Sequence, residues 1–289
     1  MPDDYTRLVE DLAAEHAELD GLVAPLSEAQ WSLPTPAEGW SIRDTVLHLA
    51  LTDEAARLAA ADPAGFEAYR QQRRGGADPF QAGRSMPPAD LLDVWRTNRQ
   101  ELLEALGQLD ARARISWFGP PMSAMSHATA RLMETWAHGQ DIGDALGVAR
   151  PASPRLRHIG HLGVRTRAYS YGQHGLTPPA SDVRVELVAP GGDVWTWGDP
   201  AAPDRVSGAA TDFCLVVVQR RHLDDTDLVC EGPHAREWLL LAQAFAGQAG
   251  AGRQPGQFRP RAESEVARAS PSTNTRAEAD PPKCDQHQV

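Results

Sequence analysis

The stretch Arg131-Leu-Met-Glu-Thr-Trp-Ala-His-Gly-Gln-Asp141 places Glu134 and His138 four residues apart. On a helix, this spacing turns both side chains onto one face. A carboxylate and an imidazole presented in this way can share one metal ion, with bonds of about 2 Å. Apolar neighbours such as Trp136 indicate that this helix is buried. A divalent cation would then remove the cost of burying the Glu134 carboxylate.

One helix supplies only two ligands, so a metal site needs a third from elsewhere in the chain. The best candidate is His48, in the apolar stretch Ser41-Ile-Arg-Asp-Thr-Val-Leu-His-Leu49. Together, His48, Glu134 and His138 would form a facial ligand set with one position left open. Zinc is the first expectation, with nickel or iron as alternatives. Each part also has a simpler explanation, because such pairs occur on solvated helices and a lone buried histidine is often a core residue.

Two more residues on the same helix face are predicted to act at the site. Asp141, three residues after His138, would orient the imidazole of that ligand; the alternative is an exposed acid near a helix end. Arg131 would neutralise the Glu134 carboxylate or bind the acid group of a substrate, although a surface arginine would need no such role. His127 shares this face and is expected near the site or at the end of the bundle, but not as a ligand.

Four segments have the apolar period of amphipathic helices. They cover about residues 5–24, 41–60, 88–106 and 122–146. Ser41, followed three residues later by Asp44, predicts a capped helix start. The stretch 62–86 is rich in glycine, proline and arginine and predicts a long loop, with a short helix around 66–72. An antiparallel four-helix bundle over residues 1–150, holding all the metal ligands, is the simplest arrangement.

A different pattern follows the bundle. Residues 153–173 are expected to form one bridging helix. From Asp182 the apolar period becomes two, which predicts a strand hairpin through Val183–Leu187 and Val194–Trp197. Further helices are expected at 209–222 and 233–246, with a short strand at 228–230 between them.

These elements predict an α+β protein with three parts. The bundle, 1–150, is followed by a bridging helix and a small α/β domain over 151–252, which would shape the substrate cleft. The remainder, 253–289, has no apolar stripe and is predicted to be a disordered, dispensable tail.

Composition excludes several classes of function. Among the 289 residues, 39 are acidic and 28 are lysine or arginine, which argues against nucleic acid or an anionic membrane as the partner. No apolar stretch approaches the roughly 20 residues of a membrane helix. Three cysteines without metal-ligand spacing fit a reducing compartment. We therefore predict a cytoplasmic monomer or homodimer that binds a small-molecule substrate.

Two motifs together resemble those of a known family. The pattern from Trp40 to Leu49, followed about ninety residues later by the stretch around Glu134 and His138, resembles the DinB-like superfamily. Within it, the chain is similar to the mycothiol-dependent maleylpyruvate isomerase group, and most similar to an uncharacterised branch. Weaker matches to the α/β domain of this group lie at 183–187, 195–198, 206–210 and 238–247, so that the resemblance covers about residues 5–253.

The resemblance implies a bundle with a small α/β domain and a thiol-dependent activity. A low-molecular-weight thiol, mycothiol in this group, would be activated at the metal and added to an electrophilic small molecule. Transfer leaves the thiol attached, whereas isomerisation expels it again. Arg220 and Arg221, which belong to the second domain, would hold anionic groups of the substrate. Two alternatives remain open: hydrolysis by the same three ligands without a thiol, and a non-catalytic module in which the metal only braces the bundle.

Overall fold

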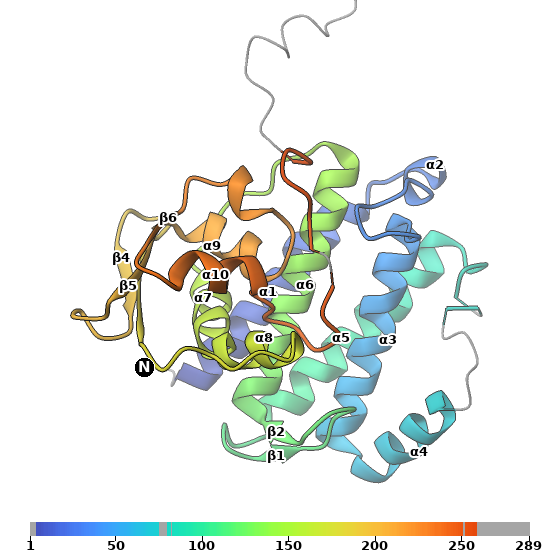
Figure 1. Ribbon diagram of the computed structural model, residues 1–289. Coiled ribbons are helices and arrows are strands. Elements are labelled where there is room, and N and C mark those ends of the chain that lie inside the picture. The colour runs from blue at the N-terminus through green and yellow to red at the C-terminus, as the bar shows by residue number, and fades with distance from the viewer. Residues whose placement is uncertain (1–3, 75–79, 82, 251, 259–289) are drawn as a thin grey trace, which may run out of the picture. The chain divides into compact units, whose positions relative to one another are not determined.

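The computed structural model describes residues 4–74, 80–81, 83–250 and 252–258. Residues 1–257 form one compact unit, and 258–289 are grouped separately. In the described part, the chain forms a mostly helical N-terminal region and a small C-terminal sheet domain (Figure 1). The predicted α+β fold class is thereby confirmed.

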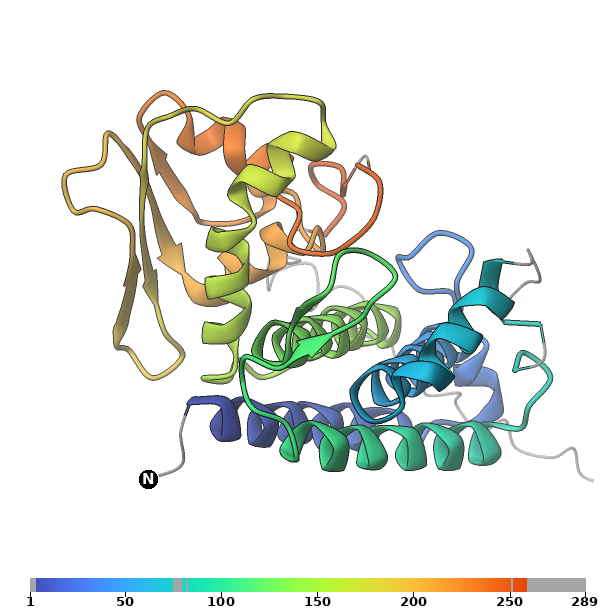
Figure 2. The same ribbon diagram turned by 90° about the horizontal axis from the view of Figure 1, so that it is seen from below.

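Four long helices build the N-terminal region. They are α1 (Asp4–Val23), α3 (Ile42–Ala61), α5 (Pro88–Gly107) and α6 (Ala124–Leu146). Each packs against two of the others, in the circular order α1, α5, α3 and α6. Figure 2 shows α1 and α5 side by side in one layer, with α3 and α6 above them. All four correspond to the helices predicted from the apolar period.

The ends of the two helices that carry the predicted ligands are set by local chemistry. Ser41 and Asp44 form the predicted capping box at the start of α3, in which each side chain bonds the backbone of the other. Ser123 accepts a hydrogen bond from the backbone N–H of Ser126 at the start of α6. Gly147 ends α6 with a φ of 67°, a conformation that glycine adopts without strain.

Part of the predicted loop after α3 is a helix. α4 (Pro63–Arg74) is longer than the short helix expected at 66–72, and a one-turn helix, α2 (Glu28–Trp31), precedes α3. Phe66 is buried, and the Tyr69 hydroxyl donates to the Leu51 carbonyl at 3.2 Å. These two contacts dock α4 on the bundle, which the glycine- and arginine-rich composition concealed. Residues 75–79 and 82 of the predicted loop lie outside the described residues.

The predicted bridging helix is divided. α7 (Leu156–Arg165) and α8 (Arg167–Gln173) meet at Thr166, whose backbone leaves the helical conformation with φ −92° and ψ 9°. α7 packs against both α6 and α9 (Ala210–Val217), and so connects the bundle to the sheet domain. A short hairpin, β1 (Arg114–Ile115) with β2 (Met122–Ser123), leads into α6.

A four-stranded sheet forms the second domain, with the order β4-β3-β5-β6. Its strands are β3 (Val183–Val188), β4 (Val194–Trp197), β5 (Asp204–Ala209) and β6 (Val229–Glu231). β3 pairs antiparallel with β4, as predicted, and parallel with β5. The sequence predicts no strand at β5, because Val206 is the only large apolar residue there.

The helices of this domain are shorter than predicted. The expected helix 209–222 ends at Val217, and the expected helix 233–246 is α10 (Ala235–Leu241); η1 (Leu223–Asp225) is a single 3-10 turn between them. Gln219 has a φ of 58° and closes α9, so that the backbone N–H of Arg220 bonds the Leu215 carbonyl at 2.7 Å.

The predicted tail begins too early. Arg253 donates to the Pro36 carbonyl at 2.7 Å and to Asp141 at 3.0 Å. A guanidinium, rather than an apolar stripe, therefore fixes this first residue of the expected tail. Residues 259–289, with Cys284 and His287, lie outside the described residues.

One hydrophobic core runs from the bundle into the sheet domain. Leu12 and Trp136 of the bundle belong to the same buried cluster as Ile159, Val206 and Phe213. A second cluster, around Trp31 and Trp95, fills the other end of the bundle. Among the helices of the described part, none combines the length and apolar character needed to cross a membrane.

A single buried carboxylate connects the four bundle helices. Asp53 of α3 accepts hydrogen bonds from Trp95 Nε1 of α5 at 3.0 Å and from Arg131 Nε and Nη2 of α6 at 3.1 and 2.8 Å. His16 Nε2 of α1 lies 3.6 Å from the same carboxylate. All four side chains are buried. We call these residues the Asp53 cluster.

Removing the carboxylate should therefore destabilise the bundle. We expect Asp53→Ala to lower the free energy of unfolding by about 3–5 kcal/mol, because it leaves the Arg131 charge buried without a partner. The control is Glu101→Ala, which breaks an ion pair between the same two helices, α3 and α5, at a half-exposed position (Arg57 to Glu101, 3.0 Å). It should cost less than about 1 kcal/mol. Equal losses in urea unfolding would contradict the assignment.

Two buried histidines predict a loss of stability in acid. Burial lowers the pKa of His16 to about 4 and that of His127 to about 3, against about 6.5 in the unfolded chain. At pH values between the folded and unfolded pKa, the unfolded chain binds more protons than the folded protein. The free energy of unfolding therefore rises with pH in this range. Each histidine should contribute a slope of roughly 1.4 kcal/mol per pH unit between about pH 6 and pH 4.5. Urea unfolding of His16→Gln and His127→Gln should give shallower slopes than the parent; unchanged slopes would refute this origin.

Candidate metal centre

The structure brings the three predicted ligands together. The ligand atoms of His48, Glu134 and His138 all lie within 4.8 Å of one another. Glu134 Oε2 is 3.8 Å from His48 Nε2 and 3.4 Å from His138 Nε2. His48 comes from α3 and the other two from successive turns of α6, so the contact between these helices assembles the group.

The pKa shifts of Glu134 and His48 favour the forms of these side chains that bind a divalent cation. Burial raises the pKa of Glu134, but hydrogen bonds from His138 and His48 outweigh it and hold that pKa well below the usual range. Burial lowers the pKa of His48, which favours the neutral imidazole that binds metals. Burial also acts to lower the pKa of His138, but its bonds to Asp141 and Glu134 raise it overall. A metal would have to displace the proton that this raised pKa favours on His138. Two neutral imidazoles and one ionised carboxylate would then form a donor set that fits zinc, nickel or iron.

Asp141 lies behind His138, as the spacing predicted. Its Oδ2 is 3.3 Å from His138 Nδ1, the ring nitrogen that faces away from Glu134. The side chain is fully buried, so the alternative of an exposed acid is wrong. Burial raises the pKa of Asp141, but Arg220 and His138 lower it to about 2. An ionised carboxylate in this position fixes the orientation of the imidazole.

Two arginines from the C-terminal part hold Asp141. Arg220 donates to it from Nε at 3.1 Å and from Nη2 at 2.7 Å, and Nη2 lies 3.5 Å from His138 Nδ1. Arg253 donates to Asp141 Oδ1 at 3.0 Å. Arg221, the other expected anion holder, is bound to Asp144 through two bonds of 2.7 Å. Of the two arginines named from the sequence, only Arg220 therefore reaches the site.

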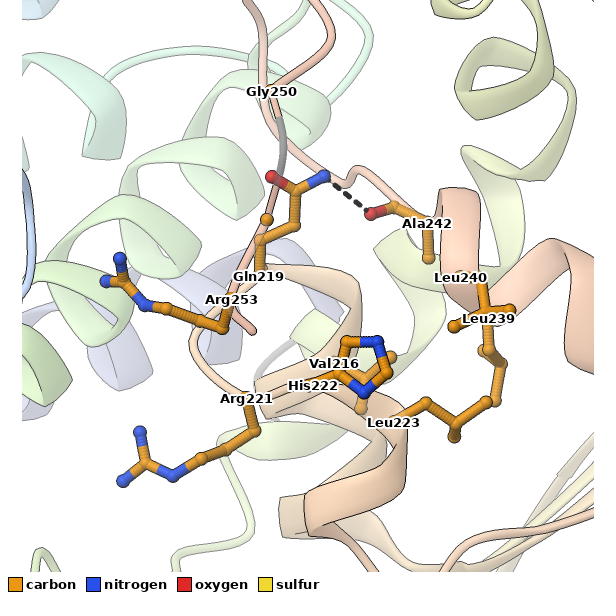
Figure 3. Close-up of a pocket in the computed structure, with 11 residues that line it drawn as sticks. Val216, Gln219, Arg221, His222, Leu223, Leu239, Leu240, Ala242, Gly250 and Arg253 are labelled. Carbon is orange, nitrogen blue, oxygen red and sulfur yellow. Dashed lines mark hydrogen bonds between the residues drawn. The ribbon is translucent and has the colours of Figure 1, made fainter. Parts of the chain in front are cut away.

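The turn after α9 determines where Arg220 points. Gln219 adopts the left-handed conformation there, and its Nε2 donates to the Ala242 carbonyl at 3.1 Å (Figure 3). A small pocket of about 80 Å³ adjoins this turn, and the guanidinium groups of Arg221 and Arg253 point away from it (Figure 3). The pocket contains none of the three ligands.

Arg131 is directed away from the surface. Its guanidinium bonds Asp53 and also donates to Thr52 Oγ1 at 3.0 Å, and its side chain is only 4% exposed. The alternative of a surface arginine is therefore wrong. These bonds join α6 to α3 beside the ligands, so we expect Arg131 to position them rather than to bind a substrate. His127, packed against Trp117 with ring centroids 4.8 Å apart, lies outside the ligand group, as expected.

Trp40 is a further candidate for a functional role, one to which the sequence alone assigned no task. Its ring stacks on His138 with centroids 5.7 Å apart and lies 5.0 Å from the ring of His48. A backbone bridge between Pro34 and Ser41 holds the turn that presents it. Its place at the start of the His48 motif was the available signal.

Two pockets open beside the ligands. One, of about 370 Å³, is lined by all three ligands together with Trp40 and Arg220. The other, of about 420 Å³, shares only Trp40 and His48 with the first. The ligand group is thus accessible from the side that carries Arg220.

The chain is similar to several known proteins. Residues 12–143 match the family described as mycothiol maleylpyruvate isomerase N-terminal domain. Two uncharacterized proteins of Mycobacterium tuberculosis, from strains CDC 1551 and H37Rv, are 49% identical over 250 residues, which are 85% of this chain and 97% of each relative.

Solved structures agree on the fold. Crystal structures of the mycothiol-dependent maleylpyruvate isomerase and of a histidine-to-alanine mutant of it superpose with TM-scores of 0.52 and 0.53 at 12% identity. Each match covers 81% of this chain and 97% of the other. The chain therefore belongs to one family with these uncharacterized mycobacterial proteins, and its residues 12–143 carry the match to the mycothiol maleylpyruvate isomerase N-terminal domain.

Proposed function

We propose that this protein is a metal-dependent enzyme that activates a low-molecular-weight thiol, mycothiol. The enzyme would either transfer this thiol to a small electrophile or use it to isomerise one. The observation that carries the proposal is the convergence of His48, Glu134 and His138 at the wall of a pocket. Zinc is the metal proposed, with nickel or iron as alternatives for this donor set. The match of residues 12–143 to the mycothiol maleylpyruvate isomerase N-terminal domain supports the use of this thiol.

Each residue of the site has a proposed task. His48, Glu134 and His138 would hold the metal, and Asp141 would keep the His138 ring in the orientation needed for binding. When bound, a divalent metal lowers the pKa of a thiol and so supplies a thiolate at neutral pH. Arg220 lines the same pocket and would attract the anionic part of a substrate or intermediate. Trp40 would exclude water from one side of the ligands.

The thiol accounts for both proposed reactions. The thiolate sulfur bonds one carbon of an electron-poor double bond, and the π electron pair moves onto the conjugated carbonyl oxygen. In isomerisation, the former double bond rotates, the electron pair returns and the thiolate leaves. In transfer, the neighbouring carbon takes a proton and the thioether remains. Arg220 can stabilise the negative oxygen in either case.

Metal content provides the first test. We expect His138→Ala to bind little zinc, while the parent binds about one ion per chain, as measured by elemental analysis after dialysis. His174→Ala, outside the ligand group, is the control. Equal and negligible metal in the parent and in His138→Ala would refute the site.

Activity and thermal melting of the same proteins distinguish a catalytic metal from one that only stabilises the bundle. Because the Asp53 cluster already joins the four helices, we expect metal removal to abolish activity and to leave a cooperative melt. A metal that only braces the bundle should instead unfold the protein when it is removed.

Thiol dependence provides the second test. Turnover of a panel of electrophilic α,β-unsaturated acids and ketones should require mycothiol and should be lost in His138→Ala. The alternative, hydrolysis by the same ligands, predicts turnover of ester and amide substrates that is indifferent to added thiol. Turnover of the second kind alone would replace the thiol mechanism with the hydrolytic one.

Further assignments stay predictions. They are a cytoplasmic location and the absence of nucleic-acid and membrane partners, which depend on composition and charge, and a monomeric or homodimeric state. The division into a bundle over 1–150 and an α/β domain over 151–252 is likewise proposed. The bundle would supply the metal ligands, and the second domain would supply Arg220.

A further inference from the structure

A second pocket lies beside the ligand group and has no role in the mechanism described above. It has a volume of about 420 Å³, within the range of small-molecule sites. His48 and Trp40 line it at one side, and α4 contributes Tyr69 and Arg73 at another. It therefore connects one predicted metal ligand, His48, to α4, a helix in the stretch whose composition predicts mostly loop.

Aromatic side chains make up much of its wall. Trp40, Tyr69, Phe80 and Phe118 all line the pocket. Trp40 and Phe80 contact each other at a centroid distance of 5.3 Å, with their planes inclined by 64°. Phe118 is 47% exposed, so its ring is accessible to a ligand. Rings that meet at steep angles around an open space suit a flat apolar group.

Arg73 is the positive group of this pocket. Its guanidinium lies 4.9 Å from the centre of the Tyr69 ring and donates to the Tyr69 hydroxyl. No carboxylate in the described part of the chain pairs with Arg73. One turn earlier on α4, by contrast, Arg70 is paired with Glu67 at 2.7 Å. An arginine that lies beside an apolar cavity and has no acidic partner among the described residues favours a carboxylate from a ligand.

We propose that this pocket binds the electrophilic substrate, and that the substrate is a carboxylic acid with a flat apolar body, such as an aryl-substituted unsaturated acid. The acid group pairs with Arg73, and the apolar body lies among the four aromatic rings. The other end of the substrate then reaches His48 and Trp40, where the thiol would attack. This last step rests on the proposed function; the binding of the acid does not.

Binding of trans-cinnamate, compared with its uncharged analogue cinnamamide, tests the proposal. Both are titrated calorimetrically into the full chain, treated with chelator and without thiol. We expect cinnamate to bind about tenfold more tightly than cinnamamide, as for one charge-assisted hydrogen-bonded pair. Arg73→Gln should remove this difference, and Arg70→Gln, on the same helix, should preserve it. Phe118→Ala should weaken both ligands.

The outcomes are decisive and separate from those for the metal. No detectable binding of either compound, equal affinity for both, or equal effects of Arg73→Gln and Arg70→Gln would overturn the proposal, once thermal melts show all variants folded. Since no metal or thiol is present, a failure here leaves the metal and thiol tests intact. Conversely, a protein that binds cinnamate through Arg73 but shows no thiol-dependent turnover would refute only the proposed function.

Discussion

The carboxylate of Asp53 is the interaction on which the bundle and the candidate site both depend. It lies at the centre of four helices. α3 supplies Asp53 itself, and each of the other three helices supplies one buried side chain beside the carboxylate. Asp53 is five residues from His48 on α3, and its partner Arg131 is three residues from Glu134 on α6. The ion pair therefore fixes the relative position of the two helices that carry the ligands. If one helix slid along the other, the ion pair would break and the ligands would move apart at the same time.

Local spacing explains what the sequence could predict. Glu134 and His138 are one helical turn apart, and the apolar period identified both ligand helices, so the ligand group followed from the local pattern and the family resemblance. Trp40, Arg220 and Arg253 could not be assigned in the same way, because their contacts depend on how distant segments pack. For Asp141, the spacing from His138 predicted the helix face that it shares with the ligands. Its two arginine partners could not be predicted.

The errors in the predicted secondary structure also arise from contacts between distant segments. β5 contains one large apolar residue, and its pairing with β3 supplies what its sequence lacks. α4 has a composition typical of loops, yet Phe66 and Tyr69 are enough to dock it. The expected helix 153–173 is divided at Thr166, although its apolar period continues across the break. In each case, tertiary contacts outweighed the local preference of the chain.

The contact between Arg220 and Asp141 bears on how this fold can be inherited. The family match ends at residue 143, so the three ligands and Asp141 lie inside it and the arginines that neutralise Asp141 lie outside. A bundle transferred alone to another protein would carry a buried negative charge with its counter-charges left behind. Recombination at this boundary would be tolerated only with a new partner that brings its own cation, or with the loss of Asp141. The segment matched by the family model is thus smaller than the segment that contains both Asp141 and its counter-charges.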